Sequence, residues 1–446
     1  MMKKALILGA GMVVKPMVHY LLDNGIQVTI ASRTKSKAEA MIKGREHGTA
    51  LAWTVDDEDT LDKLVYGHDI AVSLLPYAYH TMVAKCCIKH KKPLVTTSYV
   101  QPKMRELDKE AKDAGVLLLN EIGLDPGIDH MSAMRIIDTV HNKGGKIKEF
   151  YSLCGALPAP EAATNPFKYK FSWSPKGVVM AGNNDAKYLK HGKITEVPTE
   201  NLFKDIFNLD FPSVGELQVY PNRDSIPYID TYGIPETSTM LRGTFRYVGW
   251  CESLDAMKAL GLITNDKKDF TGKTYAEMLA MLIGANDASD IRQKAADFLK
   301  IDKNAYALDA IEWLGIFDDK PMNRKEDTPF EITSDLMIEK MPLGGDERDM
   351  CIMQHIFLAE YADGKQEVIK SRLIDFGTLN TDTAIARTVA LPASVAVRMI
   401  LEGKITETGV HIPVISGIYN PVLDALEEMN IKMIEEYGLP VSENIK

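Results

Sequence analysis

The cysteine patterns that mark disulfide scaffolds and zinc motifs are lacking from this 446-residue sequence. Its five cysteines are scattered, their number is odd, and no two of them have CxxC spacing. Disulfide-rich domains need an even number of cysteines that can pair, and zinc motifs need closely and regularly spaced ligands. We therefore expect free thiols, no bound metal and a cytoplasmic location.

An excess of positive charge and a long hydrophobic run are also lacking. The sequence has 52 Lys and Arg against 62 Asp and Glu, a net charge of −10. This balance provides no broad basic surface for nucleic acid or anionic lipid. The apolar residues 5–8 are followed by Gly9 and Gly11, and residues 383–401 contain Arg387, Pro392 and Arg398. We expect no membrane span and no signal peptide, and a buried strand near the N-terminus.

Short apolar runs alternate with helical patterns over the first 125 residues. We predict helices over 17–24 and 35–43, and strands over 5–8, 27–31, 69–75, 93–96 and 116–120. This alternation predicts an α/β fold with a doubly wound parallel sheet. The length corresponds to roughly three domains.

The later sequence has a different texture. Residues 154–250 are rich in Pro, Gly, Asn and aromatic residues, which is typical of an antiparallel sheet with long loops. Residues 253–317 have helical periodicity and predict a helical insertion. Strand patterns return at 351–361 and 367–376, and the sequence from Thr383 onward is helical again.

A glycine-rich turn follows the first predicted strand. Gly9 and Gly11 stand where a helix N-terminus approaches a dinucleotide pyrophosphate, although Val14 replaces the third glycine of the fingerprint. A simple tight turn is the alternative.

The end of the second strand lacks the acidic residue that NAD-binding proteins use to bind the ribose hydroxyls. Ser32, Arg33 and Thr34 stand there instead, followed by Lys35 and Lys37. A guanidinium and hydroxyls match a 2′-phosphate, which a carboxylate would repel. We predict NADP rather than NAD; a solvated basic turn is the alternative.

Three polar segments are candidate substrate-binding material. Residues 96–99 (TTSY) and 120–127 (NEIGLDPG) each follow a predicted parallel strand, at the sheet edge where α/β proteins bind ligands. A third group, 220–224 with 241–247, places arginines among turn formers and aromatics, which suits bidentate binding of carboxylates. For each arginine a surface ion pair is the alternative.

Ordered motifs along nearly the whole sequence resemble the glutamate-forming, NADP-dependent saccharopine dehydrogenases of lysine metabolism, also called saccharopine reductases. These motifs are LGAGMV (8–13), SLLPY (73–77) with His80, TSY (97–99), NEIGLDPG (120–127), CGALPAPE (154–161), YKFSWS (169–174) and YPNRDS (220–225). The 154–161 segment is the most specific of them.

The resemblance implies three parts. An NADP-binding Rossmann domain would span 1–125 and be completed by C-terminal helices within 390–446. A substrate and dimerisation α+β domain with a mixed sheet would span 126–252 and 319–389, with the helical insertion at 253–318.

The resemblance also implies the site residues. Together with Gly9, the NADP contacts would be Gly11, Met12, Val13, Ser32, Arg33, Thr34, Val55, Leu75, Thr97, Ser98, Leu124, Pro126 and Ser174. The saccharopine contacts would be Ser98, Tyr99, Asp125, Arg223, Thr244 and Arg246. Where relatives carry Asp before Val55, this chain has Thr54, so an adenine-side contact is expected to differ.

The chemistry implied by the resemblance interconverts saccharopine with L-glutamate and α-aminoadipate semialdehyde. Asp125 is the candidate catalytic residue, although a role in binding an ammonium group ranks ahead of proton transfer. Cys154, His80, His130 and His355 are expected to be structural, with His130 supporting the site from behind. The alternatives are a related enzyme such as carboxynorspermidine synthase, or a non-catalytic NADP(H)-binding protein. We expect a homodimer.

Overall fold

The computed structural model describes residues 2–445, which form two compact units. The first unit is Met1–Ile147 with Ala359–Lys446, and the second is Lys148–Leu358. Residues 126–147 and 359–389 thus group with the first unit, whereas the sequence-based domain boundaries assign them to the second. Helix α7 (Ile128–Asn142) packs on α16 (Ser416–Glu428), and β16 (Gln366–Phe376) pairs with β18 (Ile434–Leu439), which explains this grouping.

A seven-stranded parallel sheet forms the centre of the first unit. Its strand order is β17-β6-β5-β4-β1-β2-β3. Strands β2 and β3 are thus added on one side of β1, and the strands from β4 onward are added on the other side. The strands are β1 (Lys4–Leu8), β2 (Gln27–Ser32), β3 (Gly48–Ala52), β4 (Ile70–Ser73), β5 (Leu94–Val95), β6 (Leu117–Leu119) and β17 (Gly409–His411). Residues 5–8 of β1 are fully buried, as expected for a parallel strand covered on both faces.

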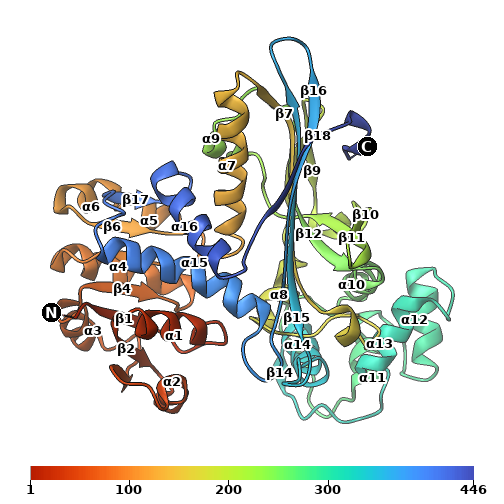
Figure 1. Cartoon of the computed structure of the whole chain (residues 1–446). Coiled ribbons are helices and arrows are strands. Elements are labelled where there is room, and N and C mark those ends of the chain that lie inside the picture. Colours follow the sequence, from red (N-terminus) through yellow and green to blue (C-terminus); the bar gives the residue numbers. More distant parts are fainter. Residues whose placement is uncertain (1, 446) are drawn as a thin grey trace. The chain divides into compact units, whose positions relative to one another are not determined.

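Two groups of helices pack in the first unit. Leu6 and Leu8 share a hydrophobic core with α3 (Glu58–Tyr66), α4 (His80–His90) and α6 (Asp108–Ala114). The other group, α1 (Lys15–Asp23), α15 (Ala384–Leu401) and α16, pack against one another. Figure 1 shows α15 and α16, in blue, among the red and orange N-terminal elements. The two remaining helices are α2 (Lys35–Ile42) and α5 (Pro102–Arg105).

The sequence-based expectation is that residues 383–401 are unsuited to a membrane span. By length and composition alone, however, helix α15 could cross a membrane. Two-thirds of it (67%) is buried inside the structure, which is the behaviour of a core helix. Thr383 caps its first turn by accepting a hydrogen bond from the Ala386 N–H at 3.1 Å.

The second unit contains a mixed sheet in the order β10-β11-β12-β7-β15, and β8 pairs with both β12 and β9. Its strands are β7 (Lys146–Pro158), β8 (Ala186–Lys190), β9 (Lys193–Val197), β10 (Phe207–Phe211), β11 (Gly215–Pro221), β12 (Thr239–Tyr247) and β15 (Asp349–Glu360). The antiparallel expectation for residues 154–250 is only partly right, because β7 and β12 are parallel. The mixed sheet implied by the family resemblance is confirmed.

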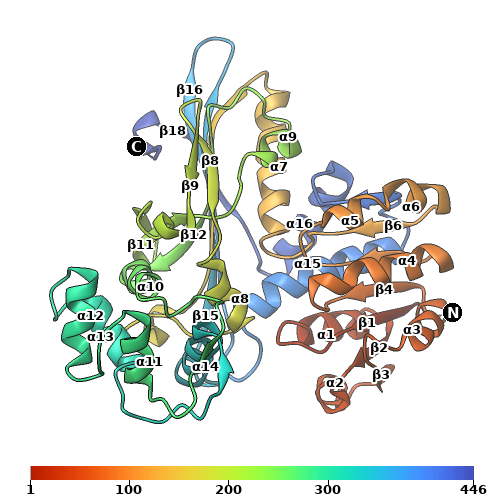
Figure 2. The ribbon, with the colours of Figure 1, turned by 180° about the vertical axis from the view of Figure 1, so that it is seen from behind.

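Helices follow β12, as the sequence predicts. They are α10 (Trp250–Ala259), α11 (Tyr275–Leu282), α12 (Ile291–Leu299) and α13 (Tyr306–Leu314), and they pack together in the order α10-α13-α12-α11. Figure 2 shows α11, α12 and α13 grouped together. The second unit is completed by α8 (Pro175–Ala181), α9 (Pro227–Tyr232), α14 (Pro329–Lys340) and the paired two-residue strands β13 (Lys268–Asp269) and β14 (Glu326–Asp327).

Candidate active site

The predicted phosphate loop connects β1 to α1. Gly9 has φ of +113°, and a Cβ at this position would lie 2.8 Å from the Leu74 carbonyl oxygen. Gly11 has open space where its side chain would be, and the neighbouring Met12 is 58% exposed. The loop therefore presents accessible backbone at the N-terminus of α1, as a pyrophosphate requires.

The end of β2 has the charge pattern that the sequence predicts. Arg33 and Thr34 are exposed, and the Ser32 hydroxyl accepts a hydrogen bond from the Thr34 N–H at 3.3 Å. Among residues 2–445, no carboxylate pairs with Arg33, which is also what the alternative of a solvated basic turn predicts. The exposed guanidinium and hydroxyls fit a 2′-phosphate.

The carboxyl ends of β4 and β5 are joined by a buried histidine. The His80 Nδ1 lies 2.8 Å from the Ser73 hydroxyl, and its Nε2 lies 2.8 Å from the hydroxyl of Ser98. Burial lowers the pKa of His80 to about 4, so the imidazole is neutral near pH 7. One ring nitrogen then donates and the other accepts, which fixes the hydroxyl of a predicted site residue.

Asp125 lies on the loop that follows β6. It is partly exposed, whereas its neighbours Leu124 and Pro126 are buried, and the Tyr99 hydroxyl donates to its Oδ1 at 2.8 Å. The structure thus brings together two of the predicted saccharopine contacts. The loop is so compact that a Cβ on Gly127 would lie 2.1 Å from the Gly123 carbonyl oxygen, so no side chain fits at this position.

Glu121 and His130 support this loop from behind, as predicted for His130. The Glu121 Oε2 lies 2.8 Å from the His130 Nε2, and its Oε1 accepts a hydrogen bond from the Val100 N–H at 2.8 Å. Both side chains are buried, and Glu121 has φ of +58°. This network connects the Tyr99 segment to the Asp125 loop through one carboxylate.

The second unit carries the predicted arginines. Thr244 and Arg246 are two residues apart on β12 and therefore point to the same face of the sheet. Arg246 is only 4% exposed, and its guanidinium lies 5.2 Å from the Tyr169 ring, 5.8 Å from Tyr220 and 5.4 Å from Trp250. Its Nη1 donates to the Phe245 carbonyl, whereas its Nε has no partner.

Arg246 therefore lacks the counter-charge that a buried guanidinium normally needs. No carboxylate among the described residues pairs with it. The Gln218 Oε1 on β11, whose residue is opposite Arg246 in the register, is also without a partner. A buried cation and an unsatisfied amide on one sheet face are suited to an anionic ligand with additional polar groups.

Arg223 and Ser174 are in a different environment from Arg246. Arg223 is exposed, with φ of +55°, and its carbonyl accepts a hydrogen bond from Lys187 at the start of β8. Ser174 is exposed and stands immediately before α8. Cys154 is 8% exposed and lies beside Thr244 in the β7–β12 register, which agrees with a packing role.

Other predicted contacts have simpler surroundings. Val55 and Leu75 pack against the core of the first unit, and Thr97 lies against Gly123, whose Cβ would be 3.2 Å from the Thr97 Cβ. His355 is fully buried on β15 among the rings of Phe150 and Phe357, an environment typical of a structural residue.

Two features are missed by sequence reasoning. The aromatic residues around Arg246 come from three separate segments, and no local spacing reveals them. The proximity of Asp62, Cys86 and His90 in the folded chain is likewise not visible in the spacing of these residues along the sequence. Burial and the nearby Asp62 carboxylate raise the pKa of Cys86 to about 11, which argues against a nucleophilic thiolate.

The comparisons with known proteins agree with these observations. Residues 5–119 match the saccharopine dehydrogenase NADP binding domain, and residues 123–431 match the saccharopine dehydrogenase C-terminal domain. The fold and these two matches thus define an NADP-dependent oxidoreductase.

Full-length relatives identify the family. The chain is 39% identical to saccharopine dehydrogenase [NADP(+), L-glutamate-forming] of Schizosaccharomyces pombe, over 98% of this chain and 99% of the relative. It is 38% identical to the enzyme of the same name from Pyricularia oryzae, over 99% of each chain. The apo structure of the Saccharomyces cerevisiae protein superposes with a TM-score of 0.89 at 36% identity, covering 98% of this chain and 99% of the other. The chain belongs to the saccharopine dehydrogenase family.

Proposed function

We propose that this chain is an NADP-dependent, L-glutamate-forming saccharopine dehydrogenase, which interconverts saccharopine with glutamate and α-aminoadipate semialdehyde in lysine metabolism. The family membership over the whole chain supports this activity. The structural observation that carries the proposal is Arg246, a buried guanidinium without a carboxylate partner on the same strand face as Thr244. Saccharopine carries three carboxylates, and this pair is suited to one of them.

NADP accepts the hydride when it is bound. The task of the first unit is to orient it, with Gly9, Gly11, Met12 and Val13 beside the pyrophosphate and Arg33 against the 2′-phosphate. The remaining proposed contacts are Ser32, Thr34, Val55, Leu75, Thr97, Ser98, Leu124, Pro126 and Ser174. The unpaired state of Arg33 supports the choice of NADP over NAD.

The proposed saccharopine contacts fall on both units. Arg223 and Arg246 bind carboxylates, and Thr244, Ser98 and Tyr99 donate or accept hydrogen bonds. Oxidation needs the secondary amine in its neutral form, hydride loss from the lysine-side carbon, and attack of water on the resulting imine. Collapse of the adduct then releases glutamate and the aldehyde.

Asp125 is the carboxylate proposed to hold the ammonium form of the substrate. Its Oδ1 accepts a hydrogen bond from the Tyr99 hydroxyl, which fixes the orientation of the carboxylate. Proton transfer through the Tyr99–Asp125 pair is the secondary role of these residues.

A homodimer and a cytoplasmic location complete the proposal. All five cysteines are free thiols, which suits a reducing compartment. Strand β18 stands at the end of its sheet and exposes Ile434 by 54% and Tyr437 by 40%, a surface suited to another copy of the chain. Light scattering of the purified chain measures the oligomeric state, and a monomer at micromolar concentration would contradict the dimer.

The activity test is the formation of NADPH from saccharopine and NADP, with NAD as the control cofactor. Saccharopine-dependent reduction of NADP that exceeds reduction of NAD is expected. Activity only with a polyamine-derived carboxylated amine would favour a carboxynorspermidine synthase. NADP binding without turnover of either substrate would favour a non-catalytic protein.

The carboxylate-binding role of Arg223 has its own test. Arg223→Ala should raise the Michaelis constant for saccharopine far more than that for NADP, because the exposed guanidinium is assigned to the substrate alone. Equal increases in both constants would contradict the assignment.

A further inference from the structure

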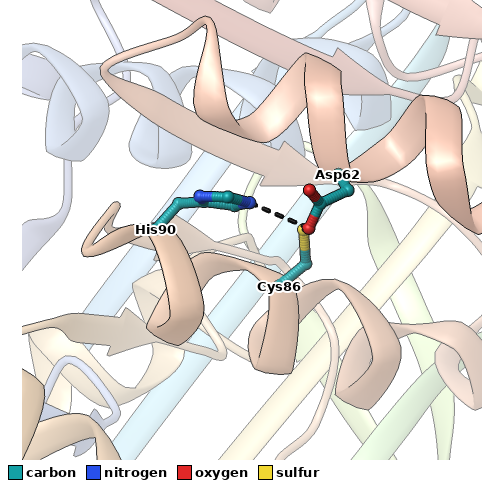
Figure 3. A group of neighbouring side chains, drawn as sticks. All are labelled: Asp62, Cys86 and His90. Carbon is teal, nitrogen blue, oxygen red and sulfur yellow. Dashed lines mark hydrogen bonds and ion pairs between the residues drawn. The ribbon is translucent and has the colours of Figure 1, made fainter.

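Three side chains capable of binding a metal meet on one side of the first unit, and none of them is assigned to NADP or saccharopine. Asp62 comes from α3, while Cys86 and His90 come from α4 (Figure 3). Cys86 and His90 are four residues apart, so they lie on the same face of α4 and point together. The packing of α3 against α4 then brings Asp62 to them.

The ligand atoms are already close together. Asp62 Oδ1 lies 2.8 Å from His90 Nε2 and 3.8 Å from Cys86 Sγ, and the three ligand atoms all lie within 4.8 Å of one another. Zinc–ligand distances of about 2.0–2.3 Å place ligands of one tetrahedral ion at similar separations. The side chains are accessible, with Asp62 37% and His90 14% exposed.

The geometry points to a binding site for one Zn²⁺ ion, or a similar borderline transition metal, held by Asp62, Cys86 and His90. A thiolate, an imidazole and a carboxylate form the mixed S/N/O ligand set that such ions take, whereas Mg²⁺ and Ca²⁺ need oxygen ligands alone. The ion joins α3 to α4.

The fourth coordination position is open. Asp62 and Cys86 line a cavity of about 610 Å³, whose other charged residues are Glu58, Lys85, Lys89 and Lys103. Three protein ligands with an accessible fourth position leave room for a water molecule or a small anion, and the excess of lysines over the Glu58 carboxylate favours the anion.

Lys89 competes with the metal. Its Nζ lies 2.6 Å from the same Asp62 oxygen, and its side chain is 64% exposed and free to move into solvent. A divalent ion replaces this ammonium at the carboxylate. Removing the lysine therefore strengthens metal binding, whereas a cluster that is merely an ion pair only loses a contact.

The test is a titration of the reduced, metal-free full chain with Co²⁺, which reports a bound thiolate by a charge-transfer absorption band in the near ultraviolet. One equivalent should produce the band, and Zn²⁺ should displace it. Cys86→Ser should abolish the band. His90→Ala and Asp62→Asn should each weaken binding at least about tenfold, since even outer-shell partners are worth this much.

Two further variants separate the site from general effects on folding. Lys89→Gln should tighten Co²⁺ binding severalfold, a gain that damage to the fold does not produce. His47→Asn, at an exposed histidine of the same unit outside the cluster, should bind as the unsubstituted chain does. The melting temperature should rise with Zn²⁺ in the unsubstituted chain but not in Cys86→Ser.

Absence of the cobalt band at millimolar metal, or a band that persists in Cys86→Ser, would overturn the proposal. Weaker binding by Lys89→Gln would do so as well. None of these outcomes would contradict the proposed saccharopine dehydrogenase activity, because the cluster shares no residue with the proposed active site.

Discussion

The two units hold their candidate ligand-binding arginines in opposite environments. Arg33 of the first unit is exposed on the turn after β2. Arg246 of the second unit lies on β12 and is buried among three aromatic rings from other segments. An exposed guanidinium is hydrated and screened, so its main effect is to discriminate between ligands with and without a phosphate. A buried guanidinium is already desolvated and fixed, so a matching carboxylate recovers much more free energy.

The largest expected effect comes from Arg246. Arg246→Met should reduce kcat/KM for saccharopine by about two to three orders of magnitude, because breaking a buried charge pair costs roughly 2–5 kcal/mol. The Michaelis constant for NADP should change little. Steady-state kinetics with each substrate varied measure both effects.

Arg246→Lys is the matched control for this variant. It keeps the charge but loses the forked guanidinium that lies over the rings of Tyr169 and Trp250, so an intermediate activity is expected. Full activity in Arg246→Met, with an unchanged melting temperature, would show that the buried arginine serves packing alone.

A smaller effect is expected at Arg33. Arg33→Gln should weaken NADP binding by roughly ten- to a hundredfold, since a hydrogen bond to a charged group is worth about 1.5–3 kcal/mol. NAD binding should remain nearly the same, and the dependence of NADP binding on salt should decrease. Calorimetric titrations at low and high salt test this, and an equal loss for both cofactors would count against a 2′-phosphate contact.

His80 should have a still smaller effect on activity. His80→Phe removes the hydrogen bonds of the imidazole with the hydroxyls of Ser73, Ser98 and Thr96, and activity should fall by about tenfold as Ser98 loses its fixed orientation. His68→Gln is the control, because His68 is also hydrogen-bonded and partly buried but contacts Leu64 and Thr29. Similar losses of activity in both variants would indicate a general effect on stability.

The stability of the first unit should also depend on pH through His80. Its pKa is lowered to about 4 in the folded chain, so the unfolded chain binds more protons between about pH 6.5 and 4. Stability from this group is therefore present near pH 7 and is lost as the pH falls, by roughly 3 kcal/mol at most. Denaturant unfolding at about pH 7 and pH 4.5 should show a smaller decrease for His80→Phe than for the unsubstituted chain.

The sequence predicts most of the first unit but not its edges. The buried central strands have continuous apolar runs, whereas β3 is half-exposed and β17 has only three residues, one of them buried. No local pattern distinguishes such edge strands from loops. Their pairing depends on the rest of the sheet rather than on their own residues.

The same division applies to the site. Ser32, Arg33 and Thr34 act within one turn, so their charge pattern can be read directly from the sequence. The surroundings of Arg246 depend on Tyr169, Tyr220 and Trp250, which only the folded second unit brings together. The Asp62, Cys86 and His90 cluster is likewise invisible until α3 packs on α4.

The late position of β17 has a consequence for biosynthesis. Residues 409–411 pair with β6, and α15 packs on α1, so the cofactor-binding unit is incomplete until nearly the whole chain has left the ribosome. At a translation rate of about 5–20 residues per second, the edge of β6 remains unpaired for many seconds before β17 is synthesised. A nascent or prematurely terminated chain would thus expose an open parallel edge, which makes it a substrate for chaperones and a risk for aggregation.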